Sequence, residues 1–202
     1  LLIFLPLNST FSVDSFLKKK SFSKVPSWSI DSIKLLITIV YLYAGIAKIN
    51  SDWLFEAMPL KIWLTSKYDL PLIGKLLQEN WVHYLMSWGG MLYDLSIPFL
   101  LMYHRTRIIA FLLVVFFHVF TLVLFPIGMF PHIMIFSAMI FFSSRFHEKA
   151  IQKLKSAIVK LNRSLENYTS QSIEYYKIKN EEYIKTVLVL FFLIQLTLPF
   201  QI

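Results

Sequence analysis

The chain has 202 residues, of which 56% are hydrophobic and 16% are charged, and its formal net charge is +8. Soluble domains carry about 45–50% apolar and about 25% charged residues, so this composition argues against a soluble domain and favours a multi-pass membrane protein. The chain has no cysteine, which excludes disulfides, thiolate metal sites and cysteine nucleophiles. The basic residues lie in short blocks beside apolar runs, so we expect no nucleic-acid partner.

Five apolar segments predict helices that span the membrane. In chain order they cover residues 33–49, 83–103, 108–125, 127–142 and 186–202. Each is close to the roughly 20 residues that a spanning helix needs, and the shorter ones would tilt less or end in the interface. The run LLIFLPL at 1–7 is too short to span, so we expect it to be the end of a helix that begins upstream. The expected fold class is all-α: a polytopic transmembrane bundle over residues 1–202, incomplete at both ends.

The polar segments between these helices alternate between two sides of the membrane. Residues 8–31, 104–107 and 143–185 fall on side one, and residues 50–81 fall on side two. Side one holds Lys18, Lys19, Lys20, Lys24, Arg105, Arg107 and every Lys and Arg from Arg145 to Lys185, whereas side two holds Lys61, Lys67 and Lys75. The positive-inside rule therefore makes side one cytoplasmic, and we expect residues 143–185 to form a charged, helical cytoplasmic loop.

Three ionisable residues lie in apolar surroundings, where such groups are costly and mark functional sites. Lys48 ends the first apolar segment, Asp94 lies in the second and His118 in the third. At about 1.5 Å per residue, Asp94 lies roughly 16 Å and His118 roughly 12 Å from side two, and Lys48 lies at its rim. All three residues are therefore predicted to occupy the half of the bilayer that faces side two.

Small residues beside these polar ones predict close contacts between helices. Gly89 and Gly90 precede Asp94, and a run of small residues precedes Lys48. Small side chains let helix backbones approach closely in a membrane. We therefore expect tight packing or a pocket at both places.

Each polar residue also has a structural interpretation. Lys48 could be an anchor that reaches for lipid headgroups, or it could pair with Asp52 one turn later. Asp94 could hydrogen-bond a neighbouring helix, and His118 could be a satisfied interior histidine. The chain has no HExxH, GxSxG, GxGxxG or P-loop motif, and its scattered histidines predict no metal site. The residues alone indicate a polytopic membrane protein with a candidate pocket open to side two.

A set of separated motifs carries a more specific signal. In order these are LNSTFSVDSFL (7–17), VPSW (25–28), VYLYAGIAKINSDWL (40–54), GGMLYDLSIPFLL (89–101), FHVF (117–120), LFPIGMFP (124–131) and QLTLP (195–199). Their order and spacing resemble the membrane module, often called the HTTM domain, of the vitamin K-dependent gamma-carboxylase family. The resemblance covers nearly the whole chain.

The resemblance implies a reaction and its participants. Enzymes of this family oxidise vitamin K hydroquinone with oxygen to the epoxide. The strong base so formed removes a γ-proton from a peptide glutamate, and carbon dioxide adds to the carbanion. The implied cofactor is reduced vitamin K, with oxygen and carbon dioxide as co-substrates. The implied partners are the lipid bilayer, the lipid-soluble quinol and glutamate-containing secreted peptides.

The resemblance also assigns residues. The family's starting base is a lysine that precedes an apolar residue and an acid–tryptophan pair, which maps onto Lys48; where the family often has a second lysine, this chain has Ala47. We expect Lys48 and His118 to be catalytic. Asp94, Tyr41 and Trp53 are expected to contact the quinol, and Tyr41 shares the helix face of Lys48.

Three functional hypotheses follow. The leading one is a gamma-carboxylase-like membrane enzyme module whose active side is extracytoplasmic or lumenal. The alternative is a non-catalytic scaffold or quinone-binding module of the same fold. A transporter subunit is a third hypothesis, motivated by the buried Asp94 and His118, and the lack of an internal inverted repeat argues against it.

Overall fold

The computed structural model describes residues 5–6, 12–13, 17, 20–161 and 171–197. The chain forms two compact units. Unit 2 is the continuous stretch Leu36–Phe141, and unit 1 combines Leu1–Leu35 with Phe142–Ile202. Residues 1–4 and 7–11 lie outside the described residues, and with them most of the segment that we interpret as the end of an upstream helix.

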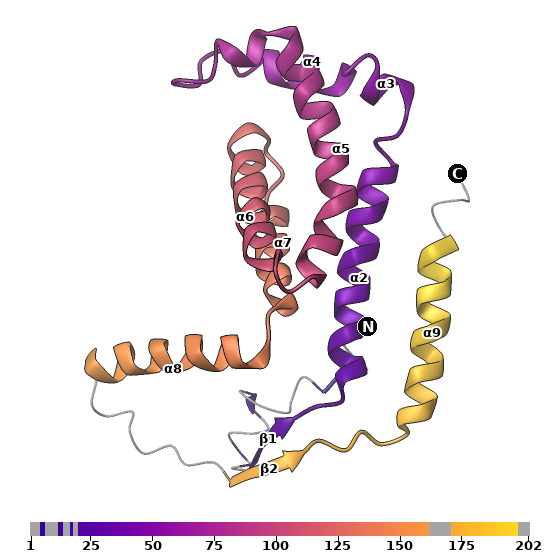
Figure 1. The fold of residues 1–202 in the computed structure, drawn as a ribbon, viewed down its shortest axis with the longest axis vertical. Coiled ribbons are helices and arrows are strands. Elements are labelled where there is room, and N and C mark those ends of the chain that lie inside the picture. The colour runs from indigo at the N-terminus through magenta and orange to yellow at the C-terminus, as the bar shows by residue number, and fades with distance from the viewer. Residues whose placement is uncertain (1–4, 7–11, 14–16, 18–19, 162–170, 198–202) are drawn as a thin grey trace. The chain divides into compact units, whose positions relative to one another are not determined.

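Three long apolar helices form the body of the fold: α2 (Ser27–Ile46), α5 (Asn80–Met102) and α6 (Arg107–Leu124). These three are long and apolar enough to cross a membrane. α5 and α6 run antiparallel because a short turn joins them (Figure 1). In that turn Arg107 donates from Nε to the Leu101 carbonyl and from Nη2 to the Met102 carbonyl, both at 3.0 Å. The guanidinium thus satisfies carbonyls at the end of α5 that have no partner within the helix.

α2 and α5 approach each other closely at Gly45. A β-carbon built on Gly45 would lie 2.6 Å from Leu95 Cδ2 and 3.2 Å from the Leu95 backbone nitrogen. Gly89 and Gly90, which we expected to allow such an approach, meet no atom within 4 Å of a built β-carbon among the described residues. The expected close approach is therefore not found at this pair, whereas the same expectation for the small residues before Lys48 is confirmed at Gly45. The small residue that admits a neighbouring helix belongs to α2.

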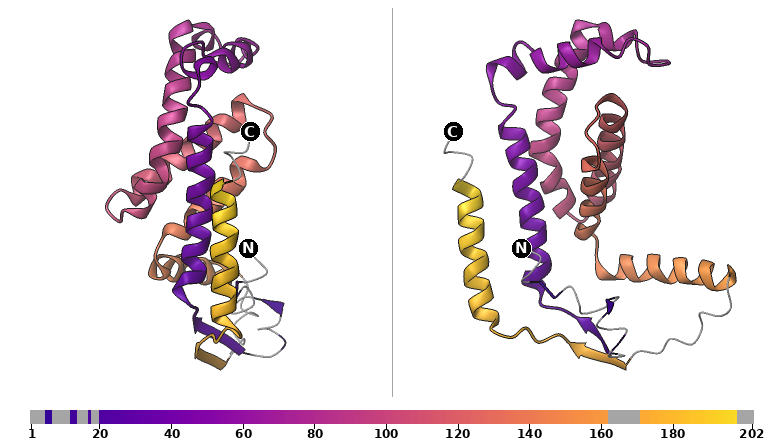
Figure 2. Two further views of the ribbon diagram at one scale, coloured as in Figure 1. Left: turned by 90° about the vertical axis from the view of Figure 1, so that its right-hand side faces the viewer. Right: turned by 180° about the vertical axis from the view of Figure 1, so that it is seen from behind.

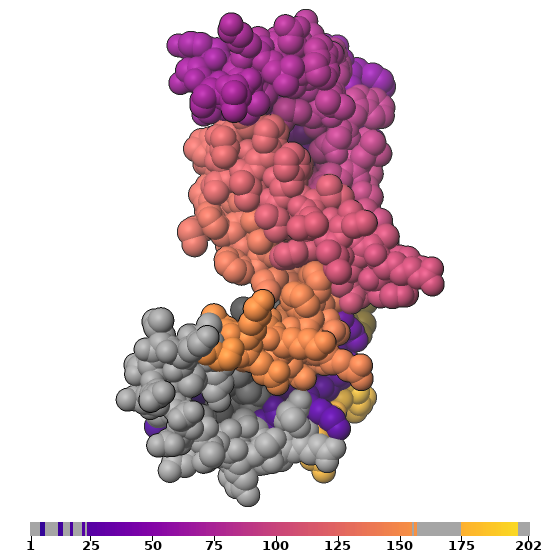
Figure 3. Space-filling view, turned by 60° about the vertical axis from the view of Figure 1, so that its left-hand side comes forward, coloured from indigo at the N-terminus to yellow at the C-terminus, as the bar shows by residue number. Residues whose placement is uncertain are grey.

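A helical cap covers one end of α5 and α6 (Figures 1 and 2). It consists of α3 (Ser51–Leu54), α4 (Met58–Thr65) and the short 3-10 helix η2 (Leu76–Gln78). Figure 3 shows the segment around α4 lying over the α6–α7 part of the molecule. The cap therefore forms a packed layer over the end of α5 and α6 that lies next to it.

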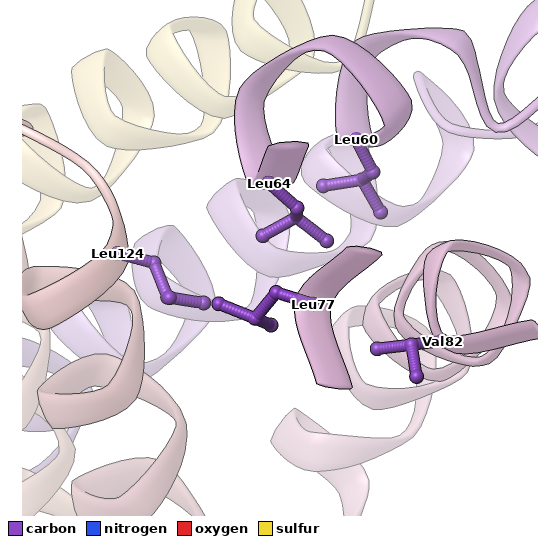
Figure 4. Packing of buried hydrophobic residues seen from close by; sticks show 5 residues of the cluster. All are labelled: Leu60, Leu64, Leu77, Val82 and Leu124. Carbon is purple, nitrogen blue, oxygen red and sulfur yellow. The ribbon is translucent and has the colours of Figure 1, made fainter. Parts of the chain in front are cut away.

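A compact apolar cluster holds the cap in place. It is built from Leu60, Leu64, Leu77, Val82 and Leu124, which are 0–5% exposed (Figure 4). Trp53 and Trp88 add two indole hydrogen bonds, from Trp53 to the Ser87 carbonyl and from Trp88 to the Leu54 carbonyl, each at 3.0 Å. Because Leu124 ends α6 and Val82 lies in α5, the cluster ties the cap to both helices.

The predicted fourth span is shorter in the structure. After α6 the chain turns through Pro126 and through Gly128, whose φ of +60° suits glycine. Helix α7 (Phe130–Ala138) then begins with Pro131 in its first turn, and the 3-10 helix η3 (Met139–Phe141) follows it. α7 lies beside α6 (Figure 1). At 1.5 Å per residue the nine residues of α7 extend about 14 Å, roughly half of an apolar core about 30 Å thick.

Unit 1 contains the only strands among the described residues. β1 (Lys20–Lys24) pairs in parallel with β2 (Gln171–Tyr175), with Phe22 opposite Ile173. Helix α8 (Ser144–Leu161) precedes β2. The segment expected to be a helical loop is therefore helical in its first part and a strand at β2, while residues 162–170 lie outside the described residues. Its cytoplasmic location stays a prediction.

The last helix, α9 (Glu181–Thr197), packs against the start of α2 within unit 1. Trp28 Nε1 donates to Glu181 Oε1 at 2.9 Å, and Lys185 lies 3.1 Å from the same oxygen. Lys185 and the Trp28 indole hold the pKa of Glu181 below its usual range. α9 is the predicted fifth segment, although it is shorter than a full span and residues 198–202 lie outside the described part of the chain.

The helical fold class is therefore confirmed, with the small β1–β2 pair added to it. The predicted count of five spans is not confirmed, because α7 and α9 are too short to count beside the three long helices. The chain is an integral membrane protein whose three apolar helices place it in the lipid bilayer.

Candidate functional site

Lys48 turns into the protein just after the end of α2. Its Nζ donates to Asp94 Oδ2 at 2.6 Å and to the Ala44 carbonyl at 2.9 Å. The Lys48 side chain is 20% exposed and that of Asp94 is 7% exposed. Lys48 is thus neither an extended anchor in the headgroups nor the partner of Asp52, since its ion pair crosses from α2 to α5.

A cavity of about 160 Å³ opens beside this ion pair within unit 2. Its lining is mostly apolar and comes from α2, α5, α6, α7 and the α6–α7 turn: Val40, Tyr41, Ala44, Lys48, Asp94, Phe117, His118, Thr121, Phe125, Ile127, Phe130 and Met134. The sequence-based depth estimates predict that Lys48, Asp94 and His118 lie in the same half of the bilayer. The structure brings all three to one cavity.

His118 and Tyr41 form the second polar contact of the cavity. Tyr41 Oη and His118 Nε2 are 3.2 Å apart, and the two residues are 1% and 3% exposed. Either group can donate, depending on which ring nitrogen of the histidine carries the proton. The His118 ring also meets the rings of Phe117 and Phe130 edge-on. Packing on two sides and a hydrogen bond on a third fix the position of the imidazole.

Trp53 lies near the ion pair and not on the wall of the cavity. Lys48 Nζ is 5.4 Å from the centroid of its ring, within the range of a cation–π contact. Ser87 also donates from its hydroxyl to the Trp53 carbonyl, so side chain and backbone of Trp53 are both held by α5. Of the five predicted site residues, Lys48, Asp94, His118 and Tyr41 line the cavity, while Trp53 covers the lysine.

The sequence did not identify several residues of the cavity wall. Thr121 follows His118 by one helical turn, so the 3.6-residue period could have found it. Phe130 and Met134 are four residues apart on α7, but their place depends on the turn at Pro126 and Gly128 that folds α7 back onto α6. Nothing in the local pattern fixes the direction of that turn.

The comparisons with known proteins identify the family of the chain. The HTTM domain matches residues 1–146, which include α2, the cap, α5, α6 and α7 and therefore all of the residues around the cavity. No solved structure matches the chain. The match covers well over half of the 202 residues. The chain therefore belongs to the HTTM domain family, the membrane module of the vitamin K-dependent gamma-carboxylases.

Proposed function

We propose that the chain is a quinol-oxidising, gamma-carboxylase-like enzyme module in which Lys48 is the starting base. The observation that carries the proposal is the inward Lys48 ammonium, paired with Asp94 at the wall of a largely apolar cavity. Membership of the HTTM family supports it, because the motif that maps the family's base onto Lys48 lies inside the matched region.

The ion pair gives Lys48 a partner for its proton. A lysine acts as a base only as the free amine, and its usual pKa near 10.4 keeps it protonated at neutral pH. Asp94 Oδ2 is 2.6 Å from Nζ, so moving one proton along this hydrogen bond converts ammonium and carboxylate into amine and carboxylic acid. Removal of water from the site favours such a neutral pair, because isolated charges are costly in apolar surroundings. Asp94 would thus hold the proton that Lys48 must release.

His118 and Tyr41 would complete the polar part of the site. Their hydrogen bond fixes the imidazole on the wall of the cavity that contains Lys48 and Asp94. A histidine held in this way can donate or accept a proton at the nitrogen that faces the ligand. We assign it to polarising a ring oxygen of the bound quinol, and Tyr41 to holding its tautomer.

The size of the cavity supports binding of one ring of a quinol head. Apolar cavities of about 150 Å³ accept a single aromatic ring, and this one is about 160 Å³. Aromatic and aliphatic side chains form most of its wall, and the polar groups gather at Lys48, Asp94 and His118. When bound, the quinol would supply the electrons for oxygen and, through its oxidation, the base strength that glutamate deprotonation requires.

The active side would be extracytoplasmic or lumenal. The sequence-based threading assigns most basic segments to the opposite side, including Arg105 and Arg107 at the α5–α6 turn, while the cap follows the Lys48 end of α2. Peptide substrates that are secreted would meet the enzyme on the cap side.

The proposal is tested by quinol epoxidation. The protein is reconstituted in lipid with reduced vitamin K, oxygen, bicarbonate and a glutamate-containing peptide, and the epoxide is quantified by chromatography. Lys48→Ala should lower epoxidation at least about 100-fold, since general bases contribute 10²–10⁴-fold, and a small external amine should restore part of it. Lys61→Ala is the matched control, because Lys61 contacts Tyr84 in the cap and does not line the cavity.

If the Lys48→Ala variant epoxidises the quinol at the rate of the unmodified protein, another group is the base. If the unmodified protein epoxidises no quinol, the enzyme hypothesis is wrong, and the non-catalytic scaffold or quinone-binding module becomes the better interpretation.

A further inference from the structure

Helix α8 (Ser144–Leu161) has an apolar side that is left exposed. His147, Ala150, Ile151 and Leu154 share this side, because residues three, four or seven positions apart lie on one face of an α-helix. Ile151 and Leu154 are 44% and 62% exposed. Among the described residues, no helix or strand packs extensively against α8. The bulky apolar side chains of this helix are therefore available to a partner.

The other side of α8 is strongly basic. Arg145, Lys149 and Lys153 follow one another at four-residue spacing and so form a stripe away from Leu154. Neither Lys149 nor Lys153 has an ion-pair partner in the described part of the chain. The basic residues of the whole helix are Arg145, Lys149, Lys153, Lys155 and Lys160, and its acidic residue is Glu148. This side of α8 is suited to a negatively charged surface.

The chain holds the start of α8 close to the bilayer. α7 folds back along α6, one of the three long apolar helices, and η3 continues α7 to Phe141. α8 begins at Ser144, and the three peptide steps between them reach about 10 Å at most. α8 carries too many charges to cross the membrane itself. Its exposed apolar side is therefore tethered beside lipid.

Charge distinguishes between the surfaces that could cover the apolar side. A second copy of α8 would bring two basic helices together, and like charges repel each other. A leaflet that contains anionic lipids offers the opposite charge, and its acyl chains accept apolar side chains. Helices with a lysine-rich side and a bulky apolar side lie in the plane of such a surface. Lysine side chains are long enough to reach the lipid phosphates while the apolar side points to the acyl chains.

We propose that α8 is an in-plane helix that docks on the anionic surface of the membrane. Its apolar side, which contains Ala150, Ile151 and Leu154, enters the boundary between headgroups and acyl chains, and its basic side pairs with lipid phosphates. The surface is the one that the positive-inside rule makes cytoplasmic. The inference is independent of the proposed function, since the Lys48 cavity lies within unit 2 and α8 belongs to unit 1.

The basic residues determine how strongly docking depends on the lipid. Each basic residue near an anionic surface strengthens binding about fivefold, which corresponds to about 1 kcal/mol. Removing two lysines should therefore shift the docking equilibrium about 25-fold towards the undocked state. In neutral lipid the same two lysines should have little effect, because the attracting charge is missing.

The depth of α8 in the membrane tests the proposal on the full chain. Since the chain has no cysteine, Leu154→Cys and Gln152→Cys each introduce a single thiol, the first on the apolar side of α8 and the second on its polar side. Each variant is labelled with an environment-sensitive fluorophore and reconstituted in phosphatidylcholine, alone or mixed with phosphatidylglycerol. Lipids that carry a nitroxide on the acyl chain quench a fluorophore that lies among those chains.

In vesicles that contain phosphatidylglycerol, the fluorophore at position 154 should be quenched strongly and the one at position 152 weakly. Quenching at position 154 should fall in phosphatidylcholine alone, and also when Lys149→Gln and Lys153→Gln are added. Lys177→Gln with Lys179→Gln is the matched control, because it removes the same charge from exposed residues outside α8, just before α9. This control should leave quenching at position 154 unchanged.

Equal quenching at positions 152 and 154 would show that α8 does not lie on the bilayer. A blue-shifted fluorophore at position 154 that the nitroxide lipids do not quench would also overturn the proposal, because a protein partner or a second copy would then cover the apolar side. If quenching at position 154 depends neither on phosphatidylglycerol nor on the two lysines, the assignment to anionic lipid is wrong.

Discussion

At the scale of single residues, the Lys48–Asp94 pair is the feature with the largest energetic consequence. Both partners come from apolar segments, and they meet at 2.6 Å with little exposure to solvent. Breaking such a pair leaves one uncompensated charge, whereas removing both partners can be nearly neutral. The two residues should therefore be coupled in stability as well as in chemistry.

A double-mutant cycle measures this coupling. Asp94→Asn and Lys48→Met should each lower the free energy of unfolding by about 1–3 kcal/mol, and the melting temperature should fall with it. This loss is smaller than for a fully buried pair because Lys48 is partly exposed. The double variant should lose less than the sum of the two. Thermal unfolding in one lipid composition is the measurement, and strictly additive losses would show that the two charges do not interact.

Much of the site could be predicted from individual residues, because an ionisable group in an apolar segment is conspicuous. Lys48, Asp94 and His118 stand out in this way, and their depths along straight helices place them in the same half of the bilayer. The partner of Lys48 was not predictable from local sequence, since Asp52 is one turn away and Asp94 is 46 positions away. Only the packing of α2 against α5 decides between them.

At the scale of elements, the contact between α2 and α5 depends on Gly45. A methyl group there would overlap the Leu95 side chain and press on its backbone nitrogen. Since Lys48 follows Gly45 by three residues and Asp94 precedes Leu95, this contact also sets the separation of the ion pair. Glycine at this position is thus a requirement of the site geometry.

Gly45→Ala and Gly90→Ala form a matched pair of variants. Gly45→Ala should destabilise the protein by about 1–3 kcal/mol through overpacking. Gly90→Ala meets nothing within 4 Å, so it should be neutral or stabilise by about 0.5–1 kcal/mol through helix propensity. Melting temperatures in the same lipid give the comparison. Equal effects of the two substitutions on the melting temperature would show that Gly45 is not the contact residue between α2 and α5.

The elements also show why one of the two predicted close approaches is missing and why the predicted count of five spans is not confirmed. The glycine pair Gly89–Gly90 near Asp94 is typical of a contact between helices. The local sequence does not determine which side of α5 meets α2, because that depends on how the helices pack together. Hydropathy over residues 127–142 is high, but the turn through Gly128 uses the first of these residues, so α7 begins only at Phe130, and its end tightens into η3. The strands β1 and β2 are short and pair across most of the chain, so neither carries a local signal.

At the scale of the whole molecule, the distribution of charge predicts the orientation in the membrane. The absence of native cysteine makes this measurable, since one introduced cysteine is the single thiol of the protein. His104→Cys lies in the exposed turn between α5 and α6, and Asp69→Cys lies exposed in the cap. Neither substitution changes the number of basic residues that determines orientation.

A membrane-impermeant maleimide added to intact cells should label Asp69→Cys and spare His104→Cys, which should react only after the membrane is opened. A cysteine at Ser66, in the same cap, serves as a second reporter for that side. Labelling of His104→Cys from outside would reverse the orientation and place the Lys48 cavity on the cytoplasmic side.

The hydrogen bond between Trp28 and Glu181 joins residues 153 positions apart, and the β1–β2 pair spans a similar separation. Unit 2, by contrast, is a single uninterrupted stretch that ends at Phe141. During synthesis, unit 2 can therefore assemble as soon as its last helix has emerged, whereas unit 1 must wait for the ribosome to deliver β2 and α9. Long-range closure of this kind is slow because a large loop must be ordered before its contacts form. The cavity is thus expected to form before β1 pairs with β2 and before Trp28 meets Glu181.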